Sequence, residues 1–197
     1  MRRILILANN DIGLYKFRKE LIAKLIKTNE VYISLPYGKM VEPLIEMRCH
    51  FIDTPVDRRG INPVTDLKLL NKYRKILDQV KPDQVITYTI KPNIYGSFAA
   101  RIKKVEYAVN ITGLGTAFQN DNLLKKIIIF MYKKALKKVK TVFFENIENR
   151  DIFIENGIIE KDKTCLLNGA GVNTEEYQYA EYPDENKHIR FLFIGRI

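Results

Sequence analysis

Short apolar runs of strand length alternate with segments of helical periodicity along most of the chain. The run at residues 3–8 is followed by Leu14, Phe17, Leu21 and Leu25, which recur at helical spacing between lysines and glutamates. Further strands are predicted at residues 31–35, 50–52, 84–88, 106–111, 141–144 and 164–167. Strands that alternate with helices are typical of βαβ units. We therefore expect an α/β fold with a Rossmann-like, doubly wound parallel sheet.

One loop at the predicted sheet edge carries the strongest indication of a ligand site. Residues 110–118 read Asn-Ile-Thr-Gly-Leu-Gly-Thr-Ala-Phe, between the strand at 106–111 and a lysine-rich helix. Gly113 and Gly115 allow a sharp turn and a close approach of the backbone to a ligand, and Thr112 adds a hydroxyl. Right-handed crossovers place the loops after parallel strands at one edge, where open α/β sheets bind ligands. We expect the binding site there.

The charge balance indicates an anionic partner. The chain has a formal net charge of +10 and a pI near 9.5, which suits nucleic acid, anionic lipid or a phosphorylated substrate. No helix-turn-helix, zinc or RNP pattern supports nucleic acid, so we expect none to bind. No apolar stretch is long enough to span a bilayer. Cys49 and Cys165 lie far apart in apolar runs, which suggests buried, reduced thiols of a cytoplasmic protein.

Four motifs, in this order along the chain, carry a family resemblance. They are Gly-Leu-Tyr-Lys-Phe-Arg at 13–18, Tyr-Thr-Ile-Lys-Pro-Asn-Ile-Tyr at 88–95, the loop at 110–118 and Gly-Ala-Gly-Val-Asn at 169–173. Together they resemble the N-terminal half of GT-B-fold glycosyltransferases of the family-4 type, especially the bacterial enzymes of capsule, O-antigen lipopolysaccharide and lipid-linked oligosaccharide assembly. The resemblance implies an acceptor-side domain at 1–176, a linker at 177–188 and, at 189–197, the first strand of a C-terminal nucleotide-sugar domain that is otherwise missing.

The resemblance also implies an activity. The family suggests a retaining hexosyltransferase that moves a hexose or N-acetylhexosamine from a nucleotide-sugar, expected to be UDP-linked, to a lipid-diphosphate-linked saccharide or a surface polysaccharide precursor. The nucleotide-sugar is a co-substrate, and no cofactor is expected. Because the family keeps most of its donor site in the C-terminal domain, we expect these 197 residues alone to be inactive. Two alternatives stay open: a non-catalytic module that binds a phospho-sugar or nucleotide, and half of a GT-B-fold sugar-nucleotide epimerase.

Candidate site residues follow from the motifs and from the loops at the same edge. Lys91 could hold a phosphate as a mobile point charge, and Gly13 lies at the first βα turn. We expect the acceptor to contact Gly13, Arg58, Arg59, Tyr88, Thr89, Lys91, Asn93, Thr112, Gly113 and Gly115, and the donor diphosphate to contact Gly13 and Arg196. Arg18 lies about one turn into the first helix; it could reach a phosphate, but most helical arginines are solvated, and we expect the same of Arg18.

No catalytic residue is assigned. Transferases of this family are thought to let the leaving phosphate assist the acceptor hydroxyl, so a dedicated base is not needed. His50 falls in a predicted strand and is expected in the core. The sequence contains no serine elbow, no HExxH and no Asp-x-Asp, and we expect no metal.

The helix predicted at residues 123–140 has seven lysines and no acidic residue. One face, with Leu124, Ile127, Ile128, Met131, Ala135 and Val139, is expected to pack on the sheet. The opposite arc combines lysines with an aromatic ring and is expected to contact an anionic membrane; its members are Lys125, Lys126, Phe130, Lys133 and Lys137. We therefore expect a peripheral protein on the inner face of the cytoplasmic membrane, with a solvated helix face as the alternative.

Overall fold

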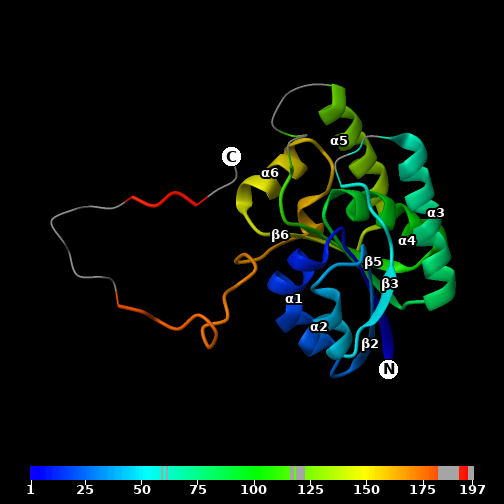
Figure 1. Cartoon of the computed structure of the whole chain (residues 1–197). Coiled ribbons are helices and arrows are strands. Elements are labelled where there is room, and N and C mark those ends of the chain that lie inside the picture. The colour runs from blue at the N-terminus through cyan, green and yellow to red at the C-terminus, as the bar shows by residue number, and fades with distance from the viewer. Residues whose placement is uncertain (59, 61, 116–117, 119–122, 182–190, 195–197) are drawn as a thin grey trace.

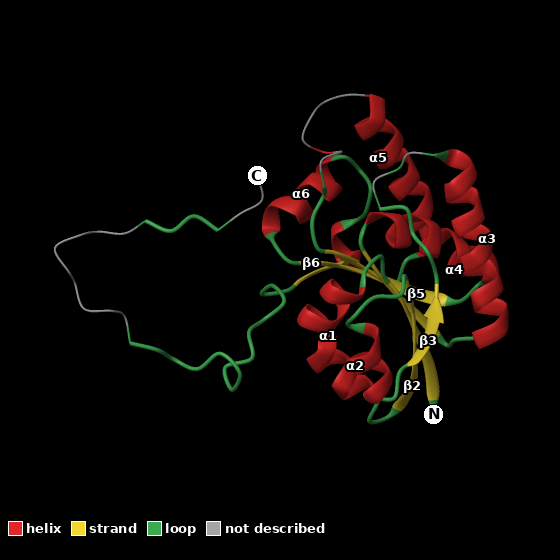
Figure 2. Ribbon diagram, in the orientation of Figure 1, coloured by secondary structure: helices red, strands yellow, loops and turns green. Residues whose placement is uncertain are grey.

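The computed structural model describes residues 1–58, 60, 62–115, 118, 123–181 and 191–194. Its centre is a sheet in which every neighbouring pair of strands is parallel (Figures 1 and 2). The strands are β1 (Arg2–Leu7), β2 (Asn29–Leu35), β3 (His50–Asp53), β4 (Gln84–Tyr88), β5 (Glu106–Ile111), β6 (Thr141–Phe144) and β7 (Thr164–Leu166). Their order is β3-β2-β1-β4-β5-β6-β7, which confirms the predicted doubly wound α/β fold.

Helices connect the strands and cover both faces of the sheet. They are α1 (Asp11–Leu25), α2 (Val41–Glu46), α3 (Pro63–Val80), α4 (Ser97–Lys103), α5 (Leu123–Ala135) and α6 (Ile147–Glu155). Pro92–Gly96 forms a π-helical turn, η1, ahead of α4, and the short 3-10 helices η3 (Leu136–Lys138) and η4 (Lys161–Lys163) follow α5 and α6. α1 and α2 pack on one face, whereas α3, α4, α5 and α6 pack on the other.

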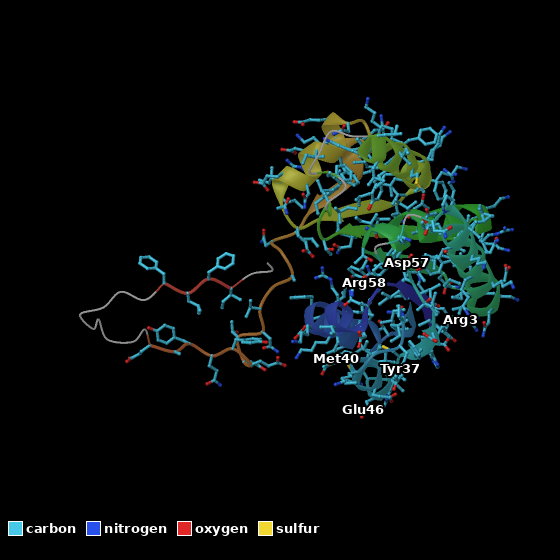
Figure 3. All side chains as sticks on the ribbon, turned by 45° about the horizontal axis from the view of Figure 1, so that its top comes forward. Arg3, Tyr37, Met40, Glu46, Asp57 and Arg58 are labelled. Carbon is cyan, nitrogen blue, oxygen red and sulfur yellow. The ribbon has the colours of Figure 1, made fainter. Side chains whose placement is uncertain are left out.

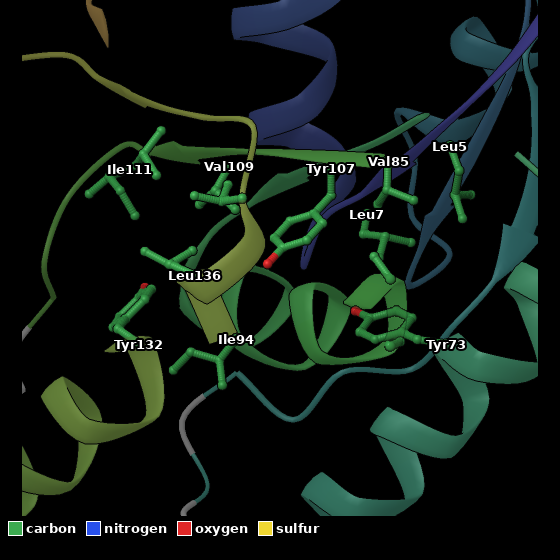
Figure 4. Packing of buried hydrophobic residues seen from close by; sticks show 14 of the residues in the cluster. Leu5, Leu7, Tyr73, Val85, Ile94, Tyr107, Val109, Ile111, Tyr132 and Leu136 are labelled. Atoms are coloured by element: carbon green, nitrogen blue, oxygen red, sulfur yellow. The ribbon is translucent and has the colours of Figure 1, made fainter. Parts of the chain in front are cut away.

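The side chains of β1 alternate between the two faces of the sheet, so this strand contributes to the hydrophobic layers on both faces. Leu5 and Leu7 join the hydrophobic cluster beneath α3 to α6, while Ile4 and Ile6 join the cluster beneath α1 and α2. Figure 4 shows the first of these clusters, with Tyr73 packed beside Leu5 and Leu7. Because side chains alternate between faces, a strand with both faces covered must be apolar throughout. Burial of both faces of the sheet thus explains the continuous apolar runs in the sequence.

The buried face of α1 differs from the predicted one. Leu14, Arg18 and Ile22 are its buried residues, whereas Phe17 and Leu21 are 58% and 41% exposed. The prediction was wrong because it followed the hydrophobic side chains and passed over the arginine. The buried stripe advances by four residues at each step, and Arg18 occupies its middle.

Three further expectations are corrected by the structure. His50 is not a core residue: its exposed ring stacks on Tyr32, with 4.6 Å between ring centroids, and its Nε2 lies 3.4 Å from Glu30 Oε1. Cys49 is buried as expected, but Cys165 is only partly buried. Ile127 of α5 is 47% exposed, while Tyr132, which was not predicted to face the core, is 2% exposed.

The described residues after β7 form no helix or strand. Residues 191–194, within the stretch expected to begin a second domain, are exposed and form no strand; the rest of 189–197 lies outside the described residues. The division into domains therefore stays a prediction. Among the described helices, none is both long and apolar enough to cross a membrane.

Candidate functional site

A cavity of about 500 Å³ opens at the carboxyl edge of the sheet, where β1 and β4 are neighbours. The chain leaves β1 toward α1 on one face and leaves β4 toward α4 on the other, so the loops after these strands diverge. Open α/β sheets bind ligands at such a switch point. The cavity is lined by Ala8, Asn9, Asn10, Ile12, Gly13, Leu14, Phe17, Arg18, Arg58, Tyr88, Thr89, Thr112, Glu145 and Ala170.

The structure brings part of the predicted site together. Among the predicted residues, Gly13, Arg58, Tyr88, Thr89 and Thr112 line the cavity, although they come from four different segments of the chain. Arg58, labelled in Figure 3, lies on the loop after β3, in a turn closed by a 2.8 Å bond from the Gly60 N–H to Asp57 Oδ1.

Other predicted residues lie away from this lining. Lys91, Asn93, Gly113 and Gly115 are not among the described residues that line the cavity. Arg59 and Arg196 lie outside the described residues. Every residue that does line the cavity belongs to α1 or to a segment at the carboxyl end of a strand, as the topology requires.

The first wall of the cavity is the start of α1. Asn10 caps this helix: its Oδ1 accepts a bond of 2.6 Å from the Gly13 N–H. Gly13 is therefore helical, not part of a preceding turn as predicted. A Cβ at this position would lie 2.9 Å from Asn10 Oδ1, so glycine keeps the cap in place.

The floor of the cavity holds an ion pair between two elements. Arg18 of α1 donates from Nη2 to Glu145, which directly follows β6; the two side chains are 9% and 19% exposed. The guanidinium also lies over the ring of Tyr88, 5.1 Å from its centroid. Burial raises the pKa of the Tyr88 hydroxyl, although the positive charge of Arg18 opposes this. Tyr88 therefore offers a neutral hydroxyl to the cavity.

The residue after β4, Thr89, has a strained backbone conformation. Thr89 has φ of 73°, a left-handed conformation that a β-branched residue rarely adopts. Its hydroxyl donates to the carbonyl oxygen of Tyr88, and its own carbonyl accepts a 2.8 Å bond from the Asn93 N–H at the π-helical turn. Strained backbone and π-helical turns both occur often at functional sites.

Lys91 is held in a buried network beside the cavity. Its Nζ lies 2.6 Å from Asp66 Oδ1, and the Tyr95 hydroxyl donates to Asp66 Oδ2 at 2.8 Å. Burial, and then the bond to Asp66, raise the pKa of Tyr95. The two charged side chains are 14% and 12% exposed. Lys91, the residue before η1, is thus tied to α3 in this structure rather than standing as a mobile charge.

Asn93 is similarly engaged in the interior. It is 2% exposed, accepts from the Thr87 hydroxyl at 2.8 Å and donates to the carbonyl oxygen of Asn110 at 3.0 Å. Through Asn93, these bonds join β4 to β5. The predicted contact of Asn93 with an acceptor gains no support from this placement.

The two glycines of the 110–118 loop differ. Gly115 has φ of +66°, which requires glycine in practice, whereas a Cβ at Gly113 would meet no atom within 4 Å. The helix that follows begins at Leu123, and most of the residues between lie outside the described part. Among the described residues of this loop, Thr112 lines the cavity.

Sequence reasoning missed Asn9, Asn10, Glu145 and Ala170 and set Arg18 aside. Glu145 directly follows a predicted strand, so the same edge rule that selected Thr89 would have selected it. Arg18 stands four residues from both Leu14 and Ile22, a spacing that places it on the buried stripe. Ala170 lies in a glycine-rich loop, and no residue pattern near it indicates that this loop lines the cavity.

The lining suits a polar ligand that carries negative charge. The charged residues of the described lining are two arginines and one glutamate, so their net charge is positive, and the hydroxyls of Tyr88, Thr89 and Thr112 can bond ligand oxygens. Among the described residues, no group of three or more His, Cys, Asp or Glu could hold a metal ion.

Comparisons with known proteins agree with this geometry. Residues 3–146 match the family model described as Glycosyl transferase 4-like. The N,N'-diacetylbacillosaminyl-diphospho-undecaprenol alpha-1,3-N-acetylgalactosaminyltransferase of Campylobacter jejuni subsp. jejuni is 25% identical over 193 residues, which are 95% of this chain and 51% of that protein. The chain therefore spans about half the length of this curated relative.

Solved structures match over a similar share. A glycosyltransferase from Rickettsia africae superposes with a TM-score of 0.68 and 18% identity, covering 90% of this chain and 45% of its own. Anabaena HepE, solved with UDP and glucose, superposes with a TM-score of 0.65 and 13% identity, covering 91% of this chain and 47% of its own. At this identity the likeness concerns the fold.

Proposed function

Because the chain belongs to the glycosyl transferase 4-like family and has the fold of one half of a GT-B enzyme, we propose that it is the acceptor side of a retaining glycosyltransferase. The observation that carries the proposal is the cavity at the switch point, with its cationic and hydroxyl-bearing lining. Phosphate and sugar hydroxyls together are the chemistry that such a lining recognises.

The proposed reaction transfers a hexose or N-acetylhexosamine from a UDP-sugar to a lipid-diphosphate-linked saccharide, a precursor of capsule or lipopolysaccharide. The name of the Campylobacter relative, which describes an acceptor on diphospho-undecaprenol, supports the acceptor class. The complex of HepE with UDP and glucose supports the donor class. Glu145, the carboxylate of the described lining, is held by Arg18, and we assign it no role as a base. In the proposed mechanism the leaving phosphate assists the acceptor hydroxyl.

We also propose that α5 holds the protein on the inner face of the cytoplasmic membrane. Leu123, Ile127 and Phe130 are 73%, 47% and 59% exposed and share one side of the helix, at a spacing of four and three residues. Exposed Lys126, Lys133 and Lys137 lie on the same helix and the turn after it. Apolar side chains among lysines fit the interface of an anionic membrane, which is where a lipid-linked acceptor is found.

A binding experiment tests the acceptor proposal. The 197-residue chain is titrated with a geranyl-diphosphate-linked N-acetylhexosamine and, separately, with a UDP-N-acetylhexosamine, while NMR follows the amide signals of Thr89 and Thr112. We expect the lipid-linked saccharide to shift both signals and the UDP-sugar to have a smaller effect. Shifts caused by the UDP-sugar alone would favour the alternative, a non-catalytic nucleotide-binding module.

These 197 residues alone should transfer no sugar. The proposal gives the cavity on this chain to the acceptor, whereas the family resemblance places most of the donor site in a C-terminal domain, and the reaction needs both substrates. Incubation of the chain with both substrates, followed by chromatography of the lipid-linked products, checks this. Repeated turnover would contradict it.

A further inference from the structure

We infer that Arg18 recognises a diphosphate group in the cavity and that Glu145 positions its guanidinium. The inference rests on the proposed function, of which it names a subsite. A lipid-linked acceptor and a nucleoside diphosphate both carry this group, so the shared chemistry is the diphosphate itself.

The burial of Arg18 is the first observation. The residue is 8% exposed and stands between Leu14 and Ile22 on the stripe that α1 turns toward the sheet. Arginine is rarely buried to this extent unless it is paired. A buried ion pair is often no more stable than apolar side chains of the same volume. Stability alone therefore does not account for a charge at this position, whereas a ligand in the adjoining cavity does.

The guanidinium is held in a fixed orientation. Nη2 donates to Glu145, Nη1 donates to the carbonyl oxygen of Phe17 at 3.1 Å, and the Tyr88 ring lies on its face. A guanidinium has more N–H donors than these bonds use within the described part of the chain. Its planar fork can place two donors on two phosphate oxygens, and an orientation fixed in advance lowers the entropic cost of binding.

The N-terminus of α1, the usual place for a phosphate in such a fold, is already occupied. Asn10 Oδ1 accepts the Gly13 N–H, and the first turn carries the Asp11 carboxylate, which accepts from the Met40 N–H at 2.8 Å. An anion there would displace a cap and meet a like charge. The cationic side of the cavity is instead formed by Arg18, with Arg58 as a second guanidinium from the loop after β3.

Glu145 is a positioning residue with a measurable signature. Its carboxylate holds Arg18 but also repels an anionic ligand in the same cavity. Glu145→Gln keeps an oxygen that can accept from Nη2 and removes the negative charge, so it should bind diphosphate more tightly than the unmodified chain. Glu145→Ala removes both the negative charge and the bond that orients Arg18, so this variant should bind diphosphate more weakly than Glu145→Gln. Equal affinities of the two variants would mean that Glu145 positions nothing.

The test uses calorimetric titration with inorganic pyrophosphate, geranyl diphosphate and UDP. Arg18→Ala should weaken binding by about tenfold or more, the size of one charge-assisted pair, and Arg18→Lys should restore only part of it. Arg101→Ala is the matched control, because Arg101 also lies over an aromatic ring, Phe98 at 5.3 Å, but outside the cavity lining. A loss confined to geranyl diphosphate assigns the subsite to the acceptor, and a loss confined to UDP assigns it to the nucleotide.

A second variant guards against misfolding, because Arg18→Ala leaves the Glu145 carboxylate unpaired. In the double variant Arg18→Gln, Glu145→Gln two neutral amides replace the pair, and it should bind pyrophosphate much more weakly than Glu145→Gln, which lacks the same carboxylate but keeps the arginine. In the unmodified chain, the Nε–H signal of Arg18 should move on addition of pyrophosphate. Unchanged affinity in every Arg18 variant, an unmoved signal in a chain that binds, or no binding of any diphosphate would overturn the inference.

The outcomes separate this inference from the function on which it rests. If the lipid-linked saccharide binds with an affinity that Arg18 does not affect, the subsite is wrong and the acceptor role stands. If pyrophosphate binds through Arg18 and the lipid-linked saccharide does not bind, the subsite stands and the acceptor role is wrong.

Discussion

At the scale of single residues, the cavity wall contains strain that can be measured. Thr89 has φ of 73°, and a conformation of this kind costs on the order of 1–3 kcal/mol in a residue other than glycine. Thr89→Gly should therefore raise the free energy of unfolding by about 1 kcal/mol. It should also weaken ligand binding, since it removes a hydroxyl from the cavity. Urea denaturation and the titrations above measure the two effects.

Arg48 supplies the control for this prediction. It also has φ of 73° but follows α2, away from the cavity lining. Arg48→Gly should stabilise the chain to a similar extent and leave binding unchanged. If Thr89→Gly destabilises the chain, then the hydroxyl bond to Tyr88 outweighs the strain.

The buried pair of Asp66 and Lys91 should matter more than any exposed pair. Asp66→Ala leaves the Lys91 charge and the Tyr95 hydroxyl without their partner in the interior, and should lower the free energy of unfolding by about 3 kcal/mol. Asp78 pairs with Lys103 at 2.6 Å but is 60% exposed, so Asp78→Ala should cost less than about 1 kcal/mol. Thermal and urea unfolding of the two variants provide the comparison, and equal losses would contradict it.

At the scale of elements, α5 makes the membrane proposal testable. The chain should sediment with vesicles rich in anionic lipid at low salt and be released at high salt, because salt screens exposed charges. Reversing Lys126, Lys133 and Lys137 to Glu should remove most of this binding. Phe130→Ser or Ile127→Ser should weaken it by removing apolar side chains from the interface.

The helix α3 offers a control with the same change in charge. Its Lys68, Lys72 and Lys75 are exposed, and reversing them to Glu changes the net charge as much as the α5 variant does. If both variants lose binding equally, attraction depends on net charge alone and α5 is not the contact. Equal binding of the unmodified chain to neutral and anionic vesicles would return α5 to a solvated helix face.

At the scale of the whole molecule, two hydrophobic layers share one sheet, and we expect them to unfold together. Cys49 reports on the layer beneath α1 and α2, where burial raises the pKa of its thiol to about 11. The thiol is therefore protonated and slow to alkylate in the folded chain below pH 9. Its alkylation in urea should follow the same transition as the far-ultraviolet circular dichroism. Alkylation at lower urea would show that this layer opens first.

The same shift predicts a pH dependence. Because the unfolded thiol has a pKa near 9.0 and the folded thiol about 11, the folded state holds this proton more tightly. The stabilisation is complete below pH 9 and is lost as the pH rises toward 11. Cys49→Ser should remove this part of the alkaline destabilisation, which urea titrations at several pH values would measure.

The sequence predicted the order of strands and helices well, because a sheet covered on both faces demands apolar runs with helical segments between them. Predictions based on the edge rule placed Thr89 and Thr112 at the cavity. The ion pair was missed because Arg18 and Glu145 are 127 residues apart and meet only after the sheet is assembled. His50 was misplaced because β3 is a four-residue strand at the edge of the sheet, and its two end residues, His50 and Asp53, are exposed.

The divergence of the loops after β1 and β4 has a consequence for how such a chain can change. The hollow between them lies where the chain turns to opposite faces of the sheet. Arg58, Thr112 and Ala170 lie in separate loops, so each can be exchanged without moving a strand. A laboratory selection for a new ligand should therefore accumulate its substitutions in these loops while the two apolar layers stay constant. The scaffold and its specificity can evolve almost independently.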